Sequence, residues 1–209
     1  MPLIKDLLAN NVQWAKSIKD EDPTFFERLA KQQNPEYLWI GCADSRVPAN
    51  EIVGMDPGEL FVHRNVANQV IQTDFNCLAV VEYAVTQLKV KHILIVGHYG
   101  CGGVAAAMES KRHGLVDHWL HPIKDIYRTH KQALDELPAP QQLDRMCELN
   151  VIEQVHNLSQ NQIIQGAWAK GQQLAIHGWV YSLKNGIARD LDVTIRSLED
   201  VDPIYQYGE

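Results

Sequence analysis

The chain has 209 residues and a mass of 23.7 kDa, and its 19 Lys and Arg against 26 Asp and Glu residues give a formal net charge of −7. This length suits one large domain, and 45% hydrophobic against 22% charged residues argues against a disordered chain. The acidic balance argues against binding to nucleic acid or to an anionic membrane surface, because both need a face rich in Lys and Arg. We expect a single domain over residues 1–209.

The N-terminal residues predict a helical arm. Apolar side chains recur on one helical stripe, which includes Ile4, Leu7, Leu8 and Val12. A polar segment at 19–23 ends this helix, a second helix is expected over 24–33, and residues 1–33 together form the arm. The stripe belongs either to the core of the chain or to a surface that meets a second copy, and we favour the dimer interface.

Short apolar runs alternate with helical segments through the rest of the chain. The predicted strands are 37–41, 58–63, 92–97, 174–181 and 187–191. The predicted helices are 74–88 with Asp74 as N-cap, 102–111 and 143–166. Strands separated by helices predict an α/β fold with a mostly parallel central sheet. Lys184-Asn185-Gly186 predicts a hairpin that adds an antiparallel edge strand.

The N-terminal residues do not resemble a secretory signal peptide, so we do not expect export. Lys5 and Asp6 interrupt this N-terminal segment, and no apolar segment with a small-residue cleavage site follows. No run approaches the roughly 18 consecutive apolar residues that a membrane span needs. We expect a reducing cytoplasm, where the four cysteines stay as thiols or bind metal.

Two of the predicted strands end in residues that bind metal. Cys42 follows the first strand, and His98 and Cys101 follow the third. If these strands are neighbours, two thiolates and one imidazole converge, which is a ligand set of catalytic zinc sites that keep one position open. Cys77 and Cys147 lie on predicted helices, where we expect them to be packing residues.

A carboxylate and a guanidinium stand beside this candidate site. Asp44 and Arg46, two residues apart after a strand, can point the same way and pair. In that state Asp44 stays ionised and can accept a hydrogen bond from a nucleophile on zinc. Released from Arg46, Asp44 can instead fill the fourth zinc position and switch the site off.

At these residues the sequence resembles a β-class carbonic anhydrase. The resemblance rests on Cys42-Ala-Asp-Ser-Arg46 and His98-x-x-Cys101-Gly-Gly103, with Phe61-Val-His-Arg-Asn-Val-Ala67 and His177-Gly-Trp-Val-Tyr181 around them. It covers nearly the whole chain. It implies four parallel strands and one antiparallel strand, flanked by helices, with an N-terminal arm that reaches over a partner subunit in a homodimer or a tetramer of paired dimers.

The resemblance also implies an activity. Zn²⁺ held by Cys42, His98 and Cys101, with Asp44 and Arg46 as the catalytic dyad, hydrates CO2 reversibly to bicarbonate and a proton, by attack of zinc-bound hydroxide. Two thiolates donate more charge than imidazoles, so we expect activity to rise above neutral pH. Two other functions remain open: a bicarbonate-sensing or anion-binding zinc protein, and a hydrolase of a CO2-like molecule such as CS2 or COS.

Three further residues match a bacterial subgroup of that family. Trp39, Arg64 and Tyr181 are similar to its non-catalytic bicarbonate pocket, where the anion favours the state with Asp on zinc. Arg64 would supply charge, and the Trp39 indole and the Tyr181 hydroxyl would supply donors. Tyr99 departs from the smaller Ser or Thr of many relatives, and its bulk would narrow access to the metal or change hydrogen bonding near it.

Overall fold

The computed structural model describes residues 3–208 and divides into two compact units, Met1–Asn34 and Pro35–Glu209. The first unit contains α1 (Ile4–Glu21) and α2 (Phe25–Lys31), close to the predicted bounds. Trp14 of α1 packs edge-on against Phe26 of α2, with ring centroids 5.7 Å apart. Neither helix has a buried residue, so the apolar stripe of α1 is exposed.

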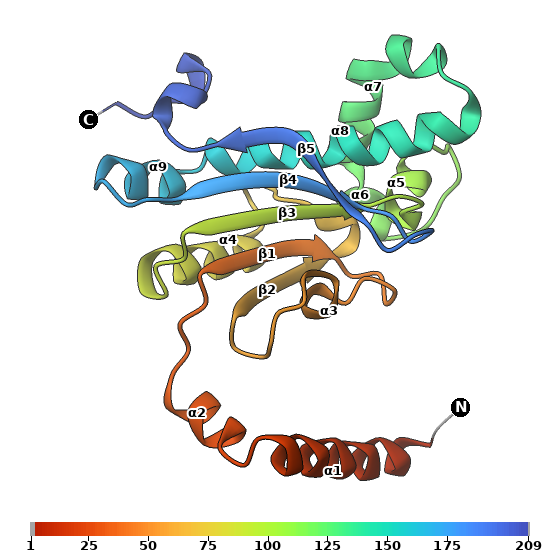
Figure 1. Ribbon diagram of the computed structural model, residues 1–209. Coiled ribbons are helices and arrows are strands. Elements are labelled where there is room, and N and C mark those ends of the chain that lie inside the picture. Colours follow the sequence, from red (N-terminus) through yellow and green to blue (C-terminus); the bar gives the residue numbers. More distant parts are fainter. Residues whose placement is uncertain (1–2, 209) are drawn as a thin grey trace. The chain divides into compact units, whose positions relative to one another are not determined.

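The second unit is built on one five-stranded sheet with the order β2-β1-β3-β4-β5 (Figure 1). Its strands are β1 (Tyr37–Cys42), β2 (Leu60–Asn65), β3 (His92–His98), β4 (Ala175–Tyr181) and β5 (Ala188–Ile195). The first four strands are parallel, and β5 pairs antiparallel with β4. The predicted fold class is confirmed, and β1 and β3, which carry the candidate metal ligands, are hydrogen-bonded neighbours.

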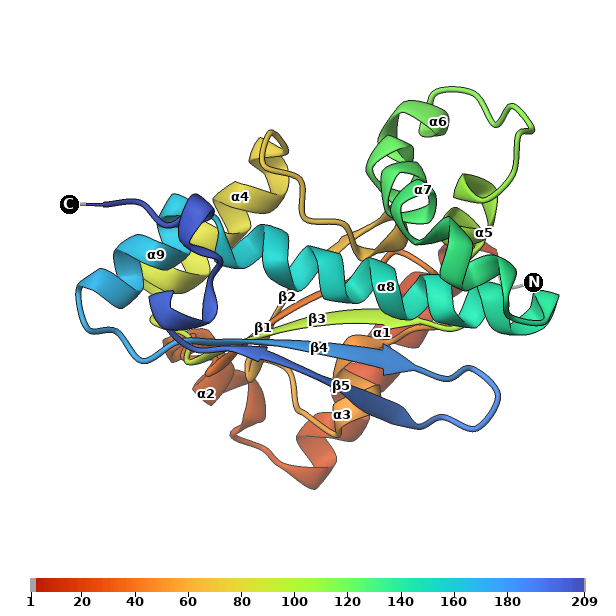
Figure 2. The same ribbon diagram turned by 90° about the horizontal axis from the view of Figure 1, so that it is seen from above.

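β3 shows why the sheet is covered on both faces. Ile93 and Ile95 point into a core shared with α4, α8 and α9, while Leu94 and Val96 pack on the side of α3. This alternation follows from the two-residue period of a strand, and the unbroken apolar run of β3 meets both layers. Figure 2 shows α8 running along the sheet, with α3 on the opposite face.

The helices differ more from the prediction than the strands do. The observed α-helices of this unit are α3 (Ala49–Val53), α4 (Phe75–Glu82), α5 (Gly102–Ala107), α6 (Val116–Trp119), α7 (His121–Asp135), α8 (Ala139–Ser159) and α9 (Gln162–Ala169). Three short 3₁₀ helices are η1 (Val66–Asn68), η3 (Leu198–Asp200) and η4 (Pro203–Tyr205). The segment η2 (Tyr83–Gln87) is a π-helix that continues α4. Among residues 3–208 no helix is both long enough and apolar enough to cross a membrane.

The predicted helix 143–166 was wrong in its bounds, because it is two helices. The side chain of Asn161 accepts a hydrogen bond from the backbone N–H of Ile163 at 2.9 Å and caps α9. An Asn side chain that bonds to the backbone in this way starts a new helix. The Asp74 cap is confirmed, since its carboxylate accepts from the Asn76 N–H at 3.1 Å.

The hairpin prediction is confirmed. The backbone N–H of Ser182 donates to the carbonyl of Ile187 at 2.9 Å, and Gly186 has φ +72°, a conformation that glycine adopts without strain. The strand returns over Ala188–Ile195, longer than the predicted 187–191. Helices α3, α6 and α7 were not predicted, and the predicted helix 102–111 ends at Ala107.

Close packing around Gly178 gives a testable expectation. A methyl group at this position of β4 would lie 2.6 Å from Val193 and 3.1 Å from both Val151 and Val155. Overpacking of this kind costs about 1–3 kcal/mol, so we expect Gly178→Ala to lower the free energy of unfolding in urea by that amount. Gly166→Ala is the control, because among the described residues an added Cβ would meet no heavy atom within 4 Å outside the adjacent residues and backbone of α9, and α9 should gain up to about 1 kcal/mol. Equal stabilities for the two variants would contradict this account.

Candidate metal centre

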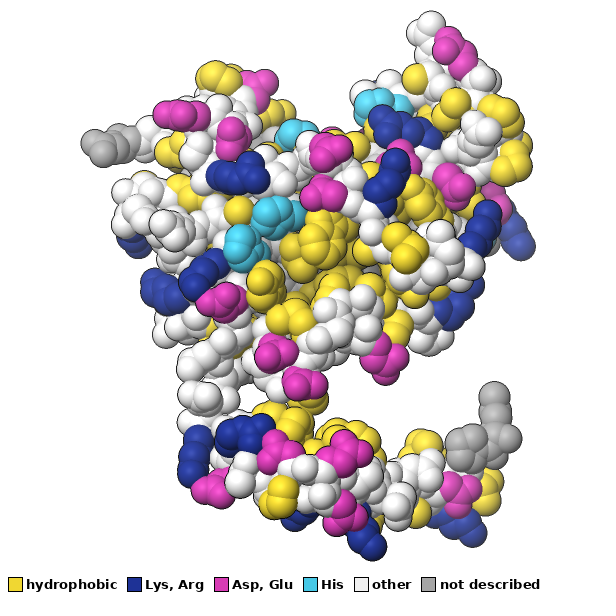
Figure 3. All heavy atoms as spheres, in the orientation of Figure 1, with side chains coloured by type: hydrophobic (Ala, Val, Ile, Leu, Met, Phe, Trp, Pro, Cys, Tyr) yellow, Lys and Arg dark blue, Asp and Glu magenta, His cyan; other side chains and the backbone are white. Residues whose placement is uncertain are grey.

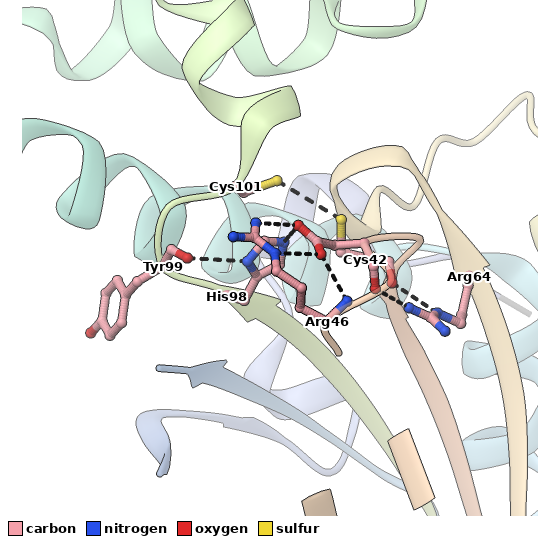
Figure 4. A network of polar contacts seen from close by, with 7 residues as sticks. Cys42, Arg46, Arg64, His98, Tyr99 and Cys101 are labelled. Atoms are coloured by element: carbon pink, nitrogen blue, oxygen red, sulfur yellow. Dashed lines mark hydrogen bonds and ion pairs between the residues drawn. The ribbon is translucent and has the colours of Figure 1, made fainter. Parts of the chain in front are cut away.

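The carboxyl ends of β1 and β3 bring Cys42, His98 and Cys101 together (Figure 4). Cys42 is the last residue of β1, His98 is the last of β3, and Cys101 is the N-cap residue of α5. Their ligating atoms all lie within 4.8 Å of one another, and the two sulfur atoms are 3.9 Å apart. The three residues are 5%, 0% and 1% exposed, so the cluster is buried.

The orientation of His98 leaves one nitrogen free for a metal. Its Nδ1 donates to the carbonyl of Tyr99 at 3.1 Å, and within the described part of the chain its buried Nε2 has no hydrogen-bond partner. An unpaired lone pair at a buried site needs an occupant. Two thiolates on one tetrahedral zinc ion, each at about 2.3 Å, stand about 3.8 Å apart, which the observed sulfur–sulfur distance matches. The donor set and its spacing therefore fit Zn²⁺.

The two thiols do not ionise independently. A hydrogen bond between the two sulfurs lowers the pKa of the Cys42 thiol. The same hydrogen bond, together with burial, raises the pKa of the Cys101 thiol. A metal ion held by both sulfurs would need both thiols deprotonated, so metal binding would release protons.

Asp44 lies beside these donors but is engaged by Arg46. Its Oδ1 accepts from Nε and from the backbone N–H of Arg46, both at 2.9 Å, and its Oδ2 accepts from Nη2 at 2.6 Å. These bonds hold the pKa of Asp44 well below its usual range. Oδ2 is 3.7 Å from Nε2 of His98. Of the two arrangements expected for Asp44, the structure shows the pair with Arg46.

Two relations hold among the predicted anion residues: Arg64 and Trp39 come from neighbouring strands, and Trp39 shares an apolar cluster on the α3 side of the sheet with Tyr181. Arg64 of β2 stands opposite Gly41 of β1, and the Trp39 indole folds over Gly41, where an added Cβ would be 2.2 Å from its Nε1. That Nε1 is buried and unpartnered in residues 3–208. Tyr181 ends β4 and packs against the same apolar cluster as Trp39.

Arg64 also makes contacts that the sequence did not indicate. Its Nε donates to the carbonyl of Cys42 at 2.9 Å, and its Nη2 donates to the carbonyl of Asp44. Arg64 thus ties β2 to the segment that carries a candidate metal ligand, Cys42, and the carboxylate of Asp44. An anion that binds through Nε and Nη2 of Arg64 would compete with the carbonyls of Cys42 and Asp44 for these donors.

Comparison with known proteins decides the family. Residues 37–188 match the family model described as carbonic anhydrase. A carbonic anhydrase of Emericella nidulans is 45% identical over 201 residues, which covers 95% of this chain and 88% of that one. This chain belongs to the β-carbonic anhydrase family.

Solved structures agree with this assignment. A Coccomyxa β-carbonic anhydrase superposes with a TM-score of 0.91 at 40% identity and covers 96% of this chain and 91% of its own. A tetrameric β-carbonic anhydrase of Sordaria macrospora superposes at 0.87 with 41% identity, covering 91% of this chain and 98% of its own. The family resemblance inferred from Cys42-Ala-Asp-Ser-Arg46 and the His98 segment is confirmed.

This β-carbonic anhydrase has a second cluster of potential ligands that does not suit a metal. His63, Asp74 and Cys77 also place their ligating atoms within 4.8 Å. However, the Asn65 amide, held by both backbone groups of Gln69, donates to Nε2 of His63 at 3.3 Å. Nδ1 of the neutral ring then carries the proton, so neither nitrogen has a free lone pair. Burial raises the pKa of the Cys77 thiol to about 12, and Cys77 lies in the core as predicted.

The remaining cysteine and Tyr99 are also placed by the structure. Cys147 is buried in the core beside α7, as predicted, and burial raises its pKa to about 12. The ring of Tyr99 points away from the metal ligands toward α8 and β5, so its bulk does not stand over the site (Figure 4). Its partners, Glu148 and Arg189, were missed, because 49 and 90 residues separate them from Tyr99 and no spacing rule connects them.

Proposed function

We propose that this enzyme catalyses the zinc-dependent, reversible hydration of CO2 to bicarbonate and a proton. One observation carries the proposal: three buried candidate metal donors, with an Nε2 of His98 that has no hydrogen-bond partner within residues 3–208, stand beside an Asp44 that is paired with Arg46. Three protein ligands with a fourth position open are typical of catalytic zinc sites. The arrangement supports a working enzyme more than a permanently closed anion sensor, in which Asp44 would occupy that position.

Each residue has a role that follows from its contacts. Zinc held by Cys42, His98 and Cys101 supplies Lewis acidity that lowers the pKa of water from 15.7 to about 7. Asp44 presents Oδ2 toward the site, accepts a hydrogen bond from the attacking water oxygen and orients it toward CO2. Arg46 keeps Asp44 ionised and fixes the direction of its lone pairs.

The pH dependence should come from the metal centre and not from Asp44. The pKa of Asp44 is held so low by Arg46 that its charge does not change between pH 5 and 9. Two thiolates reduce the Lewis acidity of zinc compared with three imidazoles, so activity should rise above neutral pH. The proton released in each turnover passes to buffer.

The proposal is tested by zinc content and stopped-flow CO2 hydration on the purified protein between pH 6.5 and 9. One zinc per chain and a rate that rises with pH would support it. Bound zinc with bicarbonate affinity but no hydration would favour the sensor, and faster turnover of CS2 or COS than of CO2 would favour the hydrolase. A folded protein that takes up no zinc would exclude the proposed metal centre.

We further propose that Trp39, Arg64 and Tyr181 form a non-catalytic bicarbonate pocket. The chain would then belong to the bacterial subgroup of the family that carries this pocket. The support for the pocket is the Nε1 of Trp39, which is buried without a hydrogen-bond partner within residues 3–208 and lies over Gly41, the residue of β1 that pairs with Arg64. Bicarbonate bound to Nε and Nη2 of Arg64 would weaken the hydrogen bonds that these atoms donate to the carbonyls of Cys42 and Asp44. That loosens the segment at Asp44, which can then leave Arg46 for zinc, giving inhibition by bicarbonate.

Trp39→Phe tests the pocket, because it keeps an aromatic ring and removes the indole N–H. A hydrogen bond to a charged group is worth about 1.5–3 kcal/mol, so the bicarbonate concentration for half-inhibition should rise at least about tenfold. The measurement is stopped-flow hydration with added bicarbonate at constant ionic strength. Trp14→Phe, in α1, is the matched control and should leave inhibition unchanged. Equal inhibition of the Trp39 variant and the wild type would remove Trp39 from the pocket.

We also propose a homodimer or a tetramer of paired dimers, with residues 1–33 as an arm at the dimer interface of a single-domain subunit. The apolar stripe of α1 is exposed, with Ile4 at 82% and Leu8 at 72%. Hydrophobic side chains also gather over the sheet in Figure 3. The tetrameric Sordaria relative supports the larger assembly. Light scattering of the full chain and of Leu8→Glu would test this, and a monomeric wild type would contradict it.

For the compartment we propose the cytoplasm. Four free cysteines, two of them 3.9 Å apart at the metal centre, need a reducing environment to remain thiols. Fractionation of cells that express the full chain would test this, and recovery of the protein in an exported or organellar fraction would contradict it.

A further inference from the structure

The segment between two metal donors depends on one side chain for its anchoring. Only Tyr99 and Gly100 separate His98 from Cys101. Gly100 has no side chain and has φ +67°, so it supplies the turn. Tyr99 supplies the carbonyl that accepts from Nδ1 of His98, and this bond determines which way Nε2 points. The position of the Tyr99 backbone therefore sets the orientation of a metal ligand.

The hydroxyl of Tyr99 is held by two charged side chains from distant parts of the chain. It donates to Oε1 of Glu148 in α8 at 2.7 Å and accepts from Nη2 of Arg189 in β5 at 2.9 Å. Arg189 also bonds to Oε1 of Glu148. On the other side, Arg145 donates to Oε2 of Glu148 at 2.8 Å. Both oxygens of Glu148 are thus engaged, and the carboxylate has one orientation.

Burial strengthens this contact. The side chain of Glu148 is 15% exposed, and hydrogen bonds to a partly buried carboxylate are stronger than those between neutral groups. The backbone N–H of Tyr99 donates to the carbonyl of Tyr181 at 3.0 Å, which holds the other end of the residue.

We propose that Tyr99, held by Glu148 and Arg189, is a positioning residue of the metal centre, an inference that rests on the proposed zinc function. The side chain of Tyr99 points away from the metal donors (Figure 4). Its backbone carbonyl orients His98, and the direction of the backbone after Tyr99 determines the position of Cys101. Groups that orient the ligands of a metal raise its affinity by 10- to 100-fold. Tyr99, Glu148 and Arg189 together prearrange the donors before the metal binds.

The test measures metal binding and not only turnover. Wild type and variants are freed of metal, and zinc affinity is determined by competition with a chromophoric chelator. We expect Tyr99→Phe and Glu148→Leu to bind zinc at least about tenfold more weakly. Cobalt(II), used as a spectroscopic probe, should show shifted sulfur-to-metal bands in both variants. Glu148→Gln keeps an acceptor oxygen for the phenol and should recover part of the affinity.

Tyr83→Phe is the matched control, since it removes a phenol hydroxyl in η2 and should change neither readout. A lower melting temperature of Tyr99→Phe with unchanged zinc affinity and cobalt bands would show a merely structural role and overturn the proposal. If Tyr99→Phe does not fold, equal affinities of Glu148→Leu and wild type would overturn it instead. A wild type that binds no zinc would refute the metal centre itself, which is a separate result.

Discussion

Replacement of Cys42 by Ser is expected to abolish stable zinc binding and to lower kcat/KM for CO2 hydration by about 10³-fold or more. The hydrogen bond with Cys101 lowers the pKa of the Cys42 thiol, which favours the thiolate that zinc binds. A Ser hydroxyl stays protonated and is a poor zinc ligand. Only His98 and Cys101 would then remain, and the site would lose both a ligand and a negative charge.

The matching control for Cys42→Ser is Cys77→Ala. Cys77 is fully buried on α4, and its raised pKa keeps it a neutral thiol. The substitution should therefore lower the free energy of unfolding but leave zinc binding unchanged. Both variants are assayed for zinc content after dialysis and for CO2 hydration by stopped flow. Removal of zinc from the wild type by a chelator should reproduce the Cys42→Ser rate, and added zinc should restore only the wild type. Full zinc occupancy in Cys42→Ser would contradict the assignment of this ligand.

Asp44→Asn is expected to keep zinc and lose activity, with kcat/KM reduced by about 10²–10³-fold. The amide is nearly the same size as the carboxylate, but it presents one acceptor oxygen where Asp44 presents two. It also loses the charge that pairs with Arg46 across 2.6 Å. The water oxygen would then be bound without being correctly oriented. Asp125→Asn, on the exposed face of α7, is the control and should retain full activity.

Asp44 also predicts a dependence of stability on pH. Its pKa is lower in the folded protein than in the unfolded chain, where it is about 3.9. Its stabilising contribution is therefore present above about pH 4 and is lost as the pH falls through the folded pKa. The difference in unfolding free energy between wild type and Asp44→Asn should shrink below pH 4. A difference that stays constant from pH 7 to pH 3 would show that the pair with Arg46 does not hold in solution.

The strands were predictable because their signals are local. β3 has an unbroken apolar run, and its start at His92 and its end near His98 follow from that run and the glycine after it. Helix ends were less predictable, since they depend on single capping contacts. The break at Asn161 arises because its side chain bonds to Ile163, in competition with helix continuation. The amphipathic α7 was missed because its long polar surface hides its few buried residues.

The candidate metal donors were recognisable because each one ends a strand or follows it closely, and the carboxyl ends of parallel strands share one edge of the sheet. The sequence did not reveal that β1 and β3 are adjacent, on which the meeting of Cys42 with Cys101 depends. Nor did it reveal which partner Asp44 takes. That choice rests on hydrogen bonds to Arg46, whose geometry is defined only once the backbone after β1 is in place.

The sequence alone determined the family and the fold class and indicated the candidate metal donors, because residue type and spacing along the chain are enough for these. The tertiary structure decided the orientation of His98, the hold of Arg64 on the Asp44 segment, and the anchoring of Tyr99 by Glu148 and Arg189. The contacts made by Arg64 and by the Tyr99 hydroxyl join residues that are 20 to 90 positions apart in the sequence. Strand order and helix packing bring such residues together, and neither composition nor periodicity encodes them.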